Sequence, residues 1–190
     1  KEITATNNAG KLALKYGQAS SDGGTSDYYV NAKVNLKAGQ NFSTQKGSNV
    51  ANNKNYQVIT ALGSATSSND GTLQGINANL NGNYVLGSNI DAGVTKTDTA
   101  NWGTIGFNPL GDWSNSFKGM FDGLGHTISD LYINRNSTTY VGLFGYINSS
   151  STVKNIGLTN VDITGDFHVG GLAGENNGLI QNSYASGSVN

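Results

Sequence analysis

Few residues of this 190-residue chain have the chemistry of a catalytic centre. It contains no cysteine and two histidines, His126 and His168, which do not form a His-x-x-x-His zinc motif. Glutamate occurs only at positions 2 and 175, and the aspartates are scattered. A glycosidase needs two carboxylates about 5–10 Å apart across a cleft, and no spacing here indicates such a pair. We therefore predict that the chain is not an enzyme and holds no metal or other cofactor.

Aromatic side chains are better candidates for a functional surface. Five residues are predicted to contribute to binding: Trp102, Phe107, Trp113, Tyr140 and Tyr146. The first three fall in a polar stretch, residues 92–116, which interrupts the repeat described below. They either pack on the rest of the protein as a small local core, which we favour, or form an exposed platform. Such a platform stacks on sugar rings or anchors a protein partner.

Three asparagines begin Asn-x-Ser/Thr sequons in stretches that we expect to be loops: Asn41, Asn136 and Asn148. They are the predicted sites of N-glycosylation. The chain is rich in Asn and Ser, so chance matches are expected as well.

The elements that position these residues follow a repeat. The sequence at 140–145, Tyr-Val-Gly-Leu-Phe-Gly, returns in altered form at 169–174. Three short apolar runs begin at Ile128, Val153 and Ile180, and they are spaced by 25 and 27 residues. Such a period is typical of a solenoid, in which each coil buries its apolar face against its neighbours. We therefore predict that these three residues lie in one column.

Each run also contains a polar residue two positions after its start. These residues are Asp130, Asn155 and Asn182. Asp and Asn tolerate positive φ and form hydrogen bonds with their own backbone, so they are suited to a bend between two short strands. We predict a polar ladder of these three residues along one corner of the solenoid.

The predicted fold is all-β: a right-handed parallel β-helix with coils about 4.8 Å apart, a loop insertion at 92–116 and one short helix. An antiparallel sandwich is the alternative, because short strands and frequent turns fit it too. The fixed register of three copies favours the solenoid.

Residues 1–190 are expected to be a single β-helical segment of a larger protein. Three parts are predicted: irregular N-terminal coils with a projecting hairpin in 1–62, a linker and short helix in 63–83, and repeat coils in 84–190. In the helix, Leu73, Ile76 and Leu80 would share one face, with Asp70 as its cap and Gly82 at its end.

Composition excludes several classes of protein. The net charge is −1 and Arg135 is the only arginine, so nucleic-acid binding is not expected. No apolar run approaches the roughly 20 residues that span a bilayer, so membrane insertion is not expected either. Charged residues make up 12% of the chain, against about 25% in globular proteins. A stacked β surface favours this composition, since like charges repeated in every coil would repel.

Two motifs resemble a known group of proteins. Residues 169–176 together with 182–187 are similar to the GLUG repeat of bacterial surface and secreted proteins. Residues 80–92 and 117–133 resemble segments of filamentous-haemagglutinin-type exoproteins, which are exported by two-partner secretion. The resemblance covers at least residues 72–190. It implies a β-helical adhesin at the bacterial outer surface or secreted from it, with an outer-membrane transporter as its partner during export.

The function predicted from sequence is therefore non-catalytic attachment to a host-cell glycan or protein receptor through the loops and faces of a β-helical rod. Two alternatives stay open: a polysaccharide-processing enzyme on the same scaffold, and an exoprotein that captures a host carrier protein for nutrients. A spacer without a binding surface of its own is a further hypothesis.

Overall fold

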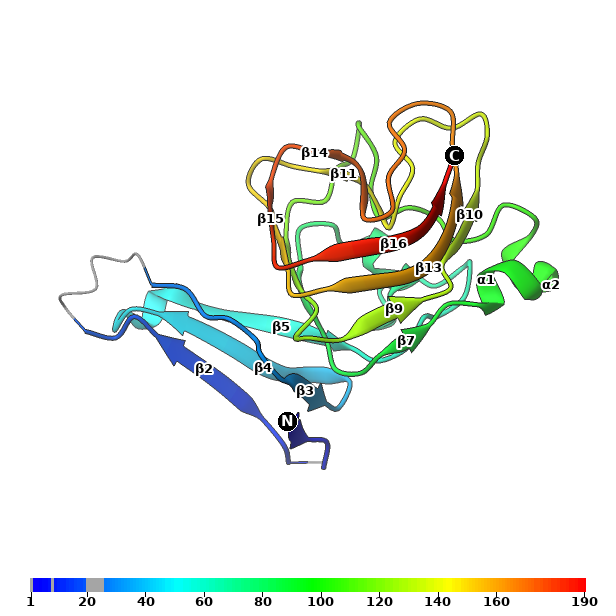
Figure 1. Cartoon of the computed structure of the whole chain (residues 1–190). Helices are drawn as coiled ribbons and strands as arrows, with labels where there is room; N and C mark the ends of the chain where they lie inside the picture. Colours follow the sequence, from blue (N-terminus) through cyan, green and yellow to red (C-terminus); the bar gives the residue numbers. More distant parts are fainter. Residues whose placement is uncertain (1, 8, 20–25) are drawn as a thin grey trace.

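The computed structural model describes residues 2–7, 9–19 and 26–190. Its strands form a parallel β-solenoid of about six turns, which confirms the predicted β-helical fold (Figure 1). Among the described strands, the one antiparallel ladder joins β4 (Gly39–Lys46) to β5 (Asn53–Ile59). The sandwich alternative is therefore excluded.

The solenoid has three walls, which each coil visits in turn. The first wall contains β6 (Asn83–Leu86), β8 (Met120–Asp122), β12 (Thr152–Lys154) and β15 (Leu179–Gln181). The second contains β7 (Ile90–Asp91), β9 (Thr127–Ser129), β10 (Tyr132–Asn134), β13 (Gly157–Thr164) and β16 (Tyr184–Val189). The third contains β11 (Phe144–Ile147) and β14 (Ala173–Asn176).

Stacked apolar columns form the core between the walls. One column holds Tyr84, Phe121, Val153 and Ile180, which are paired in register from β6 to β15. Ile128 is not part of it, because it pairs with Leu158 in the second wall. The predicted column is thus correct for Val153 and Ile180 and wrong for Ile128. The connection before β9 spans four residues and that before β13 spans two, so the two coils are offset.

The corners are marked by residues with positive φ. Asn155 and Asn182 occupy equivalent corners after β12 and β15, with φ of 54° and 47°. Asp130 has a φ of 58° as well, but it lies in the second wall, where Asn160 of the next coil donates a hydrogen bond to its carboxylate. The three residues of the predicted ladder therefore lie at two different corners, Asn155 and Asn182 at one and Asp130 at the other. In the last coil Gly187, with φ of 137°, lies opposite Val161, the residue after Asn160.

Residues 92–116 were predicted to be a loop insertion, but part of this stretch belongs to the solenoid. It begins with two short helices, α1 (Val94–Thr97) and α2 (Thr99–Trp102), which the sequence did not indicate. Its second half joins the third wall through a parallel bridge from Leu110 to Phe144. The helix predicted after Asp70 is a short 3-10 helix over Gln74–Ala78, and Leu73, Ile76 and Leu80 are buried as expected.

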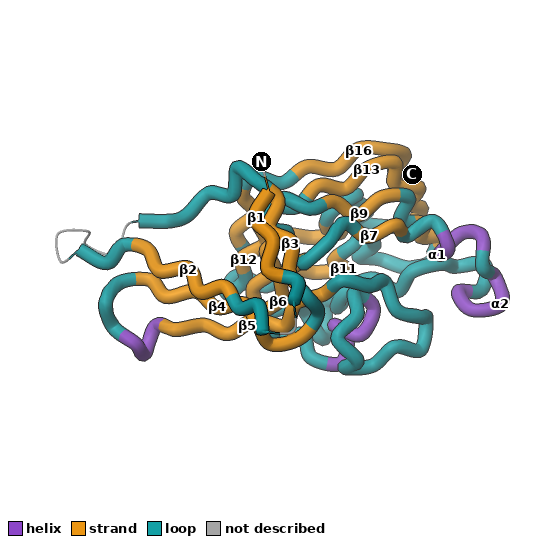
Figure 2. Tube along the Cα trace, turned by 90° about the horizontal axis from the view of Figure 1, so that it is seen from below, coloured by secondary structure: helices purple, strands orange, loops and turns teal. Residues whose placement is uncertain are grey.

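The N-terminal part covers the outside of the first wall. β4 and β5 form the projecting hairpin, and β2 (Leu12–Tyr16) extends their sheet; Figure 2 shows these strands reaching away from the solenoid. β1 (Glu2–Ala5) pairs with β3 (Lys33–Leu36). A second apolar core forms here: Val34, Leu36, Phe42, Tyr56, Val58, Val85 and Leu124. β6, β8 and β12 of the first wall are therefore largely buried on both faces, whereas β15 is partly exposed.

The three sequon asparagines differ in their surroundings. Asn136 is exposed in a turn, and Asn148 precedes a turn. Asn41 is not in a loop: it lies within β4, and its Nδ2 donates to the Lys37 carbonyl oxygen at 2.7 Å. Attachment of a glycan at Asn41 would break this bond. No helix in the described part of the chain is long and apolar enough to cross a bilayer.

Candidate functional site

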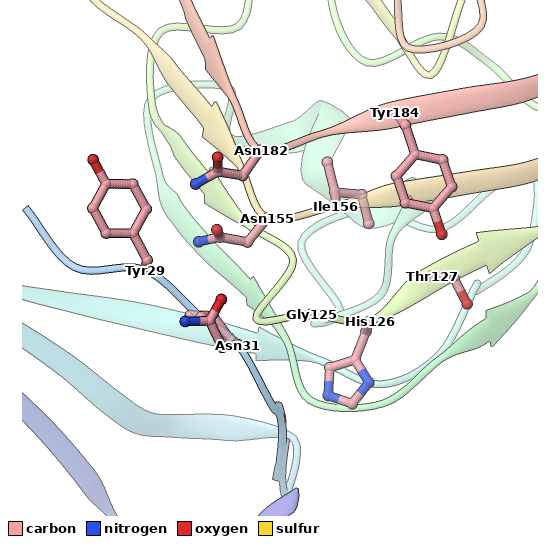
Figure 3. Close-up of a pocket in the computed structure, with 11 residues that line it drawn as sticks. Tyr29, Asn31, Gly125, His126, Thr127, Asn155, Ile156, Asn182 and Tyr184 are labelled. Carbon is pink, nitrogen blue, oxygen red and sulfur yellow. The ribbon is translucent and has the colours of Figure 1, made fainter. Parts of the chain in front are cut away.

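A groove of about 420 Å³ lies between the N-terminal part and the solenoid (Figure 3). Its volume is within the range of small-molecule sites, about 300–1,000 Å³. It is lined by Tyr29, Val30, Asn31, Gly125, His126, Thr127, Asn155, Ile156, Gly157, Asn182 and Tyr184. Residues 29–31 form one side, and successive corners of the first and second walls form the other.

Tyr184 presents a flat ring at one side of the groove. In Figure 3 its side chain hangs from β16 across β13 toward Thr127. The ring lies on Gly157, its partner in the β13–β16 ladder: a Cβ added at Gly157 would be 2.5 Å from Tyr184 Cζ. Tyr184 is nevertheless 56% exposed. The glycine thus supports one side of the ring, while much of the side chain stays open to solvent.

Amide side chains line the groove on the side away from this ring. Figure 3 shows Asn155 and Asn182 one above the other, with their amides pointing to the same side, toward Tyr29. Asn182 and Asn31 are exposed, and neither side chain forms a hydrogen bond with a described residue. Tyr29 is 67% exposed. None of the described residues lining the groove is acidic, lysine or arginine. The groove therefore offers aromatic faces and neutral hydrogen-bonding groups.

A buried carboxylate holds the groove together from beneath. Asp122 Oδ2 accepts a hydrogen bond from the Tyr28 hydroxyl at 2.6 Å. Its Oδ1 accepts bonds from Asn155 Nδ2 and the Leu124 amide nitrogen, both at 2.9 Å. One side chain therefore ties the segment before the groove to the corner that contains Asn155.

A lysine completes this attachment. Lys154 Nζ lies 3.1 Å from Asp27 Oδ1 and 3.6 Å from the centroid of the Tyr28 ring. Its side chain is only 4% exposed, and a buried charge requires such partners. We call residues 26–32 the strap, because Asp27 and Tyr28 fasten this segment to the solenoid and so place Tyr29 and Asn31.

Burial determines the ionisation of this network. Desolvation raises the pKa of Asp122 above its ordinary value of 3.8, although the bonds from Tyr28, Asn155 and Leu124 and the charge of Lys154 act in the opposite direction. Desolvation, followed by the negative charge of Asp122, also raises the pKa of Tyr28, which keeps the hydroxyl protonated as a donor.

This raised pKa has a consequence for stability. A carboxyl group with a folded-state pKa above 3.8 stabilises the fold most below pH 3.8, and this contribution is lost as pH rises through the folded-state pKa. We expect Asp122→Asn, which resembles the neutral acid, to be at least as stable as the wild type at pH 7. As pH falls toward 4, the free energy of unfolding of the wild type should rise relative to that of Asp122→Asn. Urea unfolding of both proteins from pH 4 to 8 measures this difference, and a variant that loses most at pH 7 contradicts it.

His126 is part of the floor of the groove. It is 2% exposed. Its Nε2 lies 3.0 Å from the Val34 carbonyl oxygen, and its Nδ1 lies 3.1 Å from Asn89 Oδ1. Desolvation lowers the pKa of His126, and the neutral ring donates to one of these two oxygens. Within the described residues, no three His, Asp or Glu side chains gather as a metal site.

Two of the predicted aromatic residues belong to the core. Trp102 and Phe107 are 2% and 0% exposed, and their rings stack at 6.1 Å. They match the local core that we favoured and are unavailable to a ligand. Trp113 is separate from them and 70% exposed. The predicted aromatic platform of these three residues is therefore not present.

Tyr140 and Tyr146 come together on another face. Their ring centroids are 5.6 Å apart, and His168 of the next coil stacks on Tyr140 at 4.8 Å. His168 Nδ1 lies 3.2 Å from Glu175 Oε2, and Tyr146 accepts a hydrogen bond from Asn177. These tyrosines are thus engaged with one another and with the neighbouring coil.

The groove residues Tyr29, Asn31 and Tyr184 were not predicted from the sequence. The sequence could have indicated Tyr184, because it lies in the last copy of the repeat opposite Gly157. A tyrosine that packs on a glycine keeps its ring accessible. For Tyr29 and Asn31 no local signal exists, because their position depends on the neighbouring residues Tyr28 and Asp27. Tyr28 contacts Asp122 and Asp27 contacts Lys154, which lie 94 and 127 residues further along the chain.

Comparisons with known proteins agree with this architecture. The family model of the GLUG motif matches residues 165–190, which contain β14, β15 and β16. The chain is 41% identical over 109 residues to halomucin of Haloquadratum walsbyi, a match that covers 56% of this chain and 1% of that protein. It is 41% identical over 83 residues to a protein of Evansella cellulosilytica named "Putative Gly-rich membrane protein", which covers 42% of this chain and 10% of that protein.

No solved structure matches the chain significantly. The chain therefore contains a GLUG motif, and the matched part corresponds to a small fraction of much longer relatives.

Proposed function

We propose that this chain is a saccharide-binding segment of a secreted or cell-surface repeat protein, and that it attaches the cell to glycans. The GLUG motif and the solenoid support a repeat protein, and the names of the two relatives support a place at the cell surface. Export by two-partner secretion, with an outer-membrane transporter as partner, rests on the resemblance to filamentous-haemagglutinin-type exoproteins alone.

One observation carries the proposal of a saccharide ligand: the exposed Tyr184 ring, supported by Gly157, in a groove that also exposes the unbonded amides of Asn31 and Asn182. The apolar face of a sugar ring packs on an aromatic ring, while its hydroxyl groups exchange hydrogen bonds with amides. Because no charged side chain of the described residues lines the groove, the ligand class is an uncharged saccharide. The pairing of Tyr184 with Gly157 also stabilises the ladder between β13 and β16. Binding measurements separate this structural role of Tyr184 from its role in contacting the ligand.

The test compares the wild type with four variants on an array of neutral glycans. Tyr184→Ala is expected to weaken binding by about tenfold or more, as for a buried aromatic contact at an interface. Tyr184→Phe keeps the ring and should bind within a few-fold of the wild type. Gly157→Ala retains the tyrosine but displaces its ring, so it should bind as weakly as Tyr184→Ala.

Trp113→Ala is the matched control, because it removes an exposed aromatic residue that lies outside the groove. It should bind like the wild type. Equal binding by Tyr184→Ala, Gly157→Ala and the wild type would sink the proposal. Turnover of the bound glycan would instead support the polysaccharide-processing alternative.

A further inference from the structure

The only arginine of the chain lies in a second, smaller cavity. This cavity has a volume of about 150 Å³ and is lined by Asn77, Leu80, Asn108, Pro109, Gly111, Asp112, Asn115, Arg135, Thr138, Thr139 and Tyr140. None of these residues lines the groove of Figure 3. The lining combines a guanidinium group with hydroxyl and amide groups and the ring of Tyr140.

Arg135 is half-buried without a charged partner. Its Nε donates a hydrogen bond to the Phe107 carbonyl oxygen at 3.3 Å. The rest of its guanidinium group forms no hydrogen bond or ion pair with a described residue. Desolvation lowers the pKa of Arg135, which is the sign of a charge whose burial is not compensated. Four N–H groups in a planar fork thus remain for a ligand.

The loops around Arg135 are fixed by backbone hydrogen bonds. The Arg135 amide nitrogen donates to the Thr164 carbonyl oxygen at 2.9 Å, and the Thr138 amide nitrogen donates back to the Arg135 carbonyl oxygen at 2.8 Å. Across the cavity, Asn77 Nδ2 donates to the Pro109 carbonyl oxygen at 3.1 Å. Its Oδ1 accepts from the Gly111 amide nitrogen at 2.9 Å. Both sides of the cavity are therefore held in place before any ligand binds.

One acidic side chain shares the cavity. Asp112 Oδ1 accepts hydrogen bonds from Ser114 Oγ, Ser114 N and Asn115 N at 2.7–2.8 Å. These bonds lower the pKa of Asp112, so it is ionised at neutral pH. It is not paired with Arg135 in the described structure. An anion at Arg135 therefore binds against a modest opposing charge, which removal of the carboxylate would relieve.

We propose that Arg135 binds the carboxylate of an acidic sugar, such as a uronic acid, in this cavity. The planar guanidinium group matches a carboxylate in a bidentate arrangement. Thr138, Thr139 and Tyr140 line the same cavity and supply hydroxyl groups for the sugar. This site is separate from the groove and goes beyond the proposed function, because it takes an acidic saccharide where the groove takes a neutral one.

The experiment titrates the whole chain with methyl glucuronide and with methyl glucoside, which differ in the carboxylate. Binding is followed by NMR chemical shifts at low salt. The wild type should bind the glucuronide with at least about tenfold preference, as for a charge-assisted bidentate contact. Arg135→Gln should lose this preference, and Arg135→Lys should keep only part of it. Asp112→Asn should bind the glucuronide a few-fold more tightly while keeping its turn.

Controls separate this site from general charge and from the groove. Lys118→Gln removes one exposed positive charge outside the cavity and should bind the glucuronide like the wild type. Tyr184→Ala should also leave glucuronide binding unchanged, so failure of the groove and failure of this site give different results. Equal glucuronide binding by Arg135→Gln and the wild type overturns the proposal. Binding of glucose 6-sulfate without binding of the glucuronide overturns the assignment of a carboxylate.

Discussion

Gly119→Ala is expected to destabilise the solenoid by about 3 kcal/mol or more, at or above the upper end of what overpacking usually costs. A Cβ on Gly119 would lie 1.8 Å from the Gly82 carbonyl oxygen and 2.8 Å from its carbonyl carbon. Both are backbone atoms of the coil beneath, so no side-chain rotation relieves the clash. The coils must move apart next to β6 and β8, whose residues Tyr84 and Phe121 pair in the core column.

Gly93→Ala is the matched control for this prediction. The nearest atoms to its added Cβ are Asp91 Oδ1 at 3.1 Å and Asp130 Cβ at 3.6 Å. Its φ of −57° and ψ of −27° suit alanine, so the change in stability should stay below about 1 kcal/mol. Urea unfolding followed by circular dichroism compares both variants with the wild type. Equal midpoints for the two variants would show that the coils do not approach each other as closely as the structure indicates.

The solenoid could be predicted because its physical basis is local and repeated. Apolar residues recur in each coil, and asparagine recurs at the corners, where positive φ at Asn155 and Asn182 matches the preference of that residue. These features recur in the copies that begin at Val153 and Ile180 and do not depend on distant contacts. A projecting hairpin was expected within residues 1–62, and the structure forms it from β4 and β5, but the sequence did not indicate which strands make it.

The register of the first copy could not be predicted. The spacing of Ile128, Leu131 and Ile133 equals that of Val153, Ile156 and Leu158, so the two runs align by apolar pattern alone. In the structure Ile128 lies opposite Leu158, because the corner after β8 is longer than the corner after β12. Only backbone pairing distinguishes the two alignments. The predicted ladder that joined Asp130 to Asn155 was wrong for the same reason.

The candidate sites were predicted poorly because they join residues that are distant in sequence. The sequence left two roles open for Trp102 and Phe107, a local core, which we favoured, and a binding platform; their rings pack into the core between the coils. Arg135 stood out only as evidence against nucleic-acid binding. Its lack of a charged partner is a property of the folded surroundings, and no sequence pattern reports it.

Tyr28→Ala is expected to have the other large effect, because it detaches the strap. Tyr28 is 9% exposed, and its ring packs edge-on against Tyr16 at 5.1 Å and under Lys154. Loss of a buried aromatic ring costs about 3–5 kcal/mol, and the buried Asp122 loses one of its donors as well. Tyr28→Phe removes only the hydroxyl group and should cost about 1–3 kcal/mol, the penalty of a lost buried hydrogen bond.

The loss should appear in the strap before it appears in the solenoid. In Tyr28→Ala, the amides of residues 26–36 should exchange with deuterium much faster, while those of β9 and β13 keep their protection. Tyr29→Ala is the matched control, since Tyr29 is the next residue and 67% exposed, and its effect on stability should be within about 0.5 kcal/mol. Because the strap carries Tyr29 and Asn31, Tyr28→Ala should also weaken saccharide binding in the groove although Tyr184 is intact. Unchanged exchange in the strap would mean that Asp122 and Lys154 do not hold it, and the groove would then need another explanation for its shape.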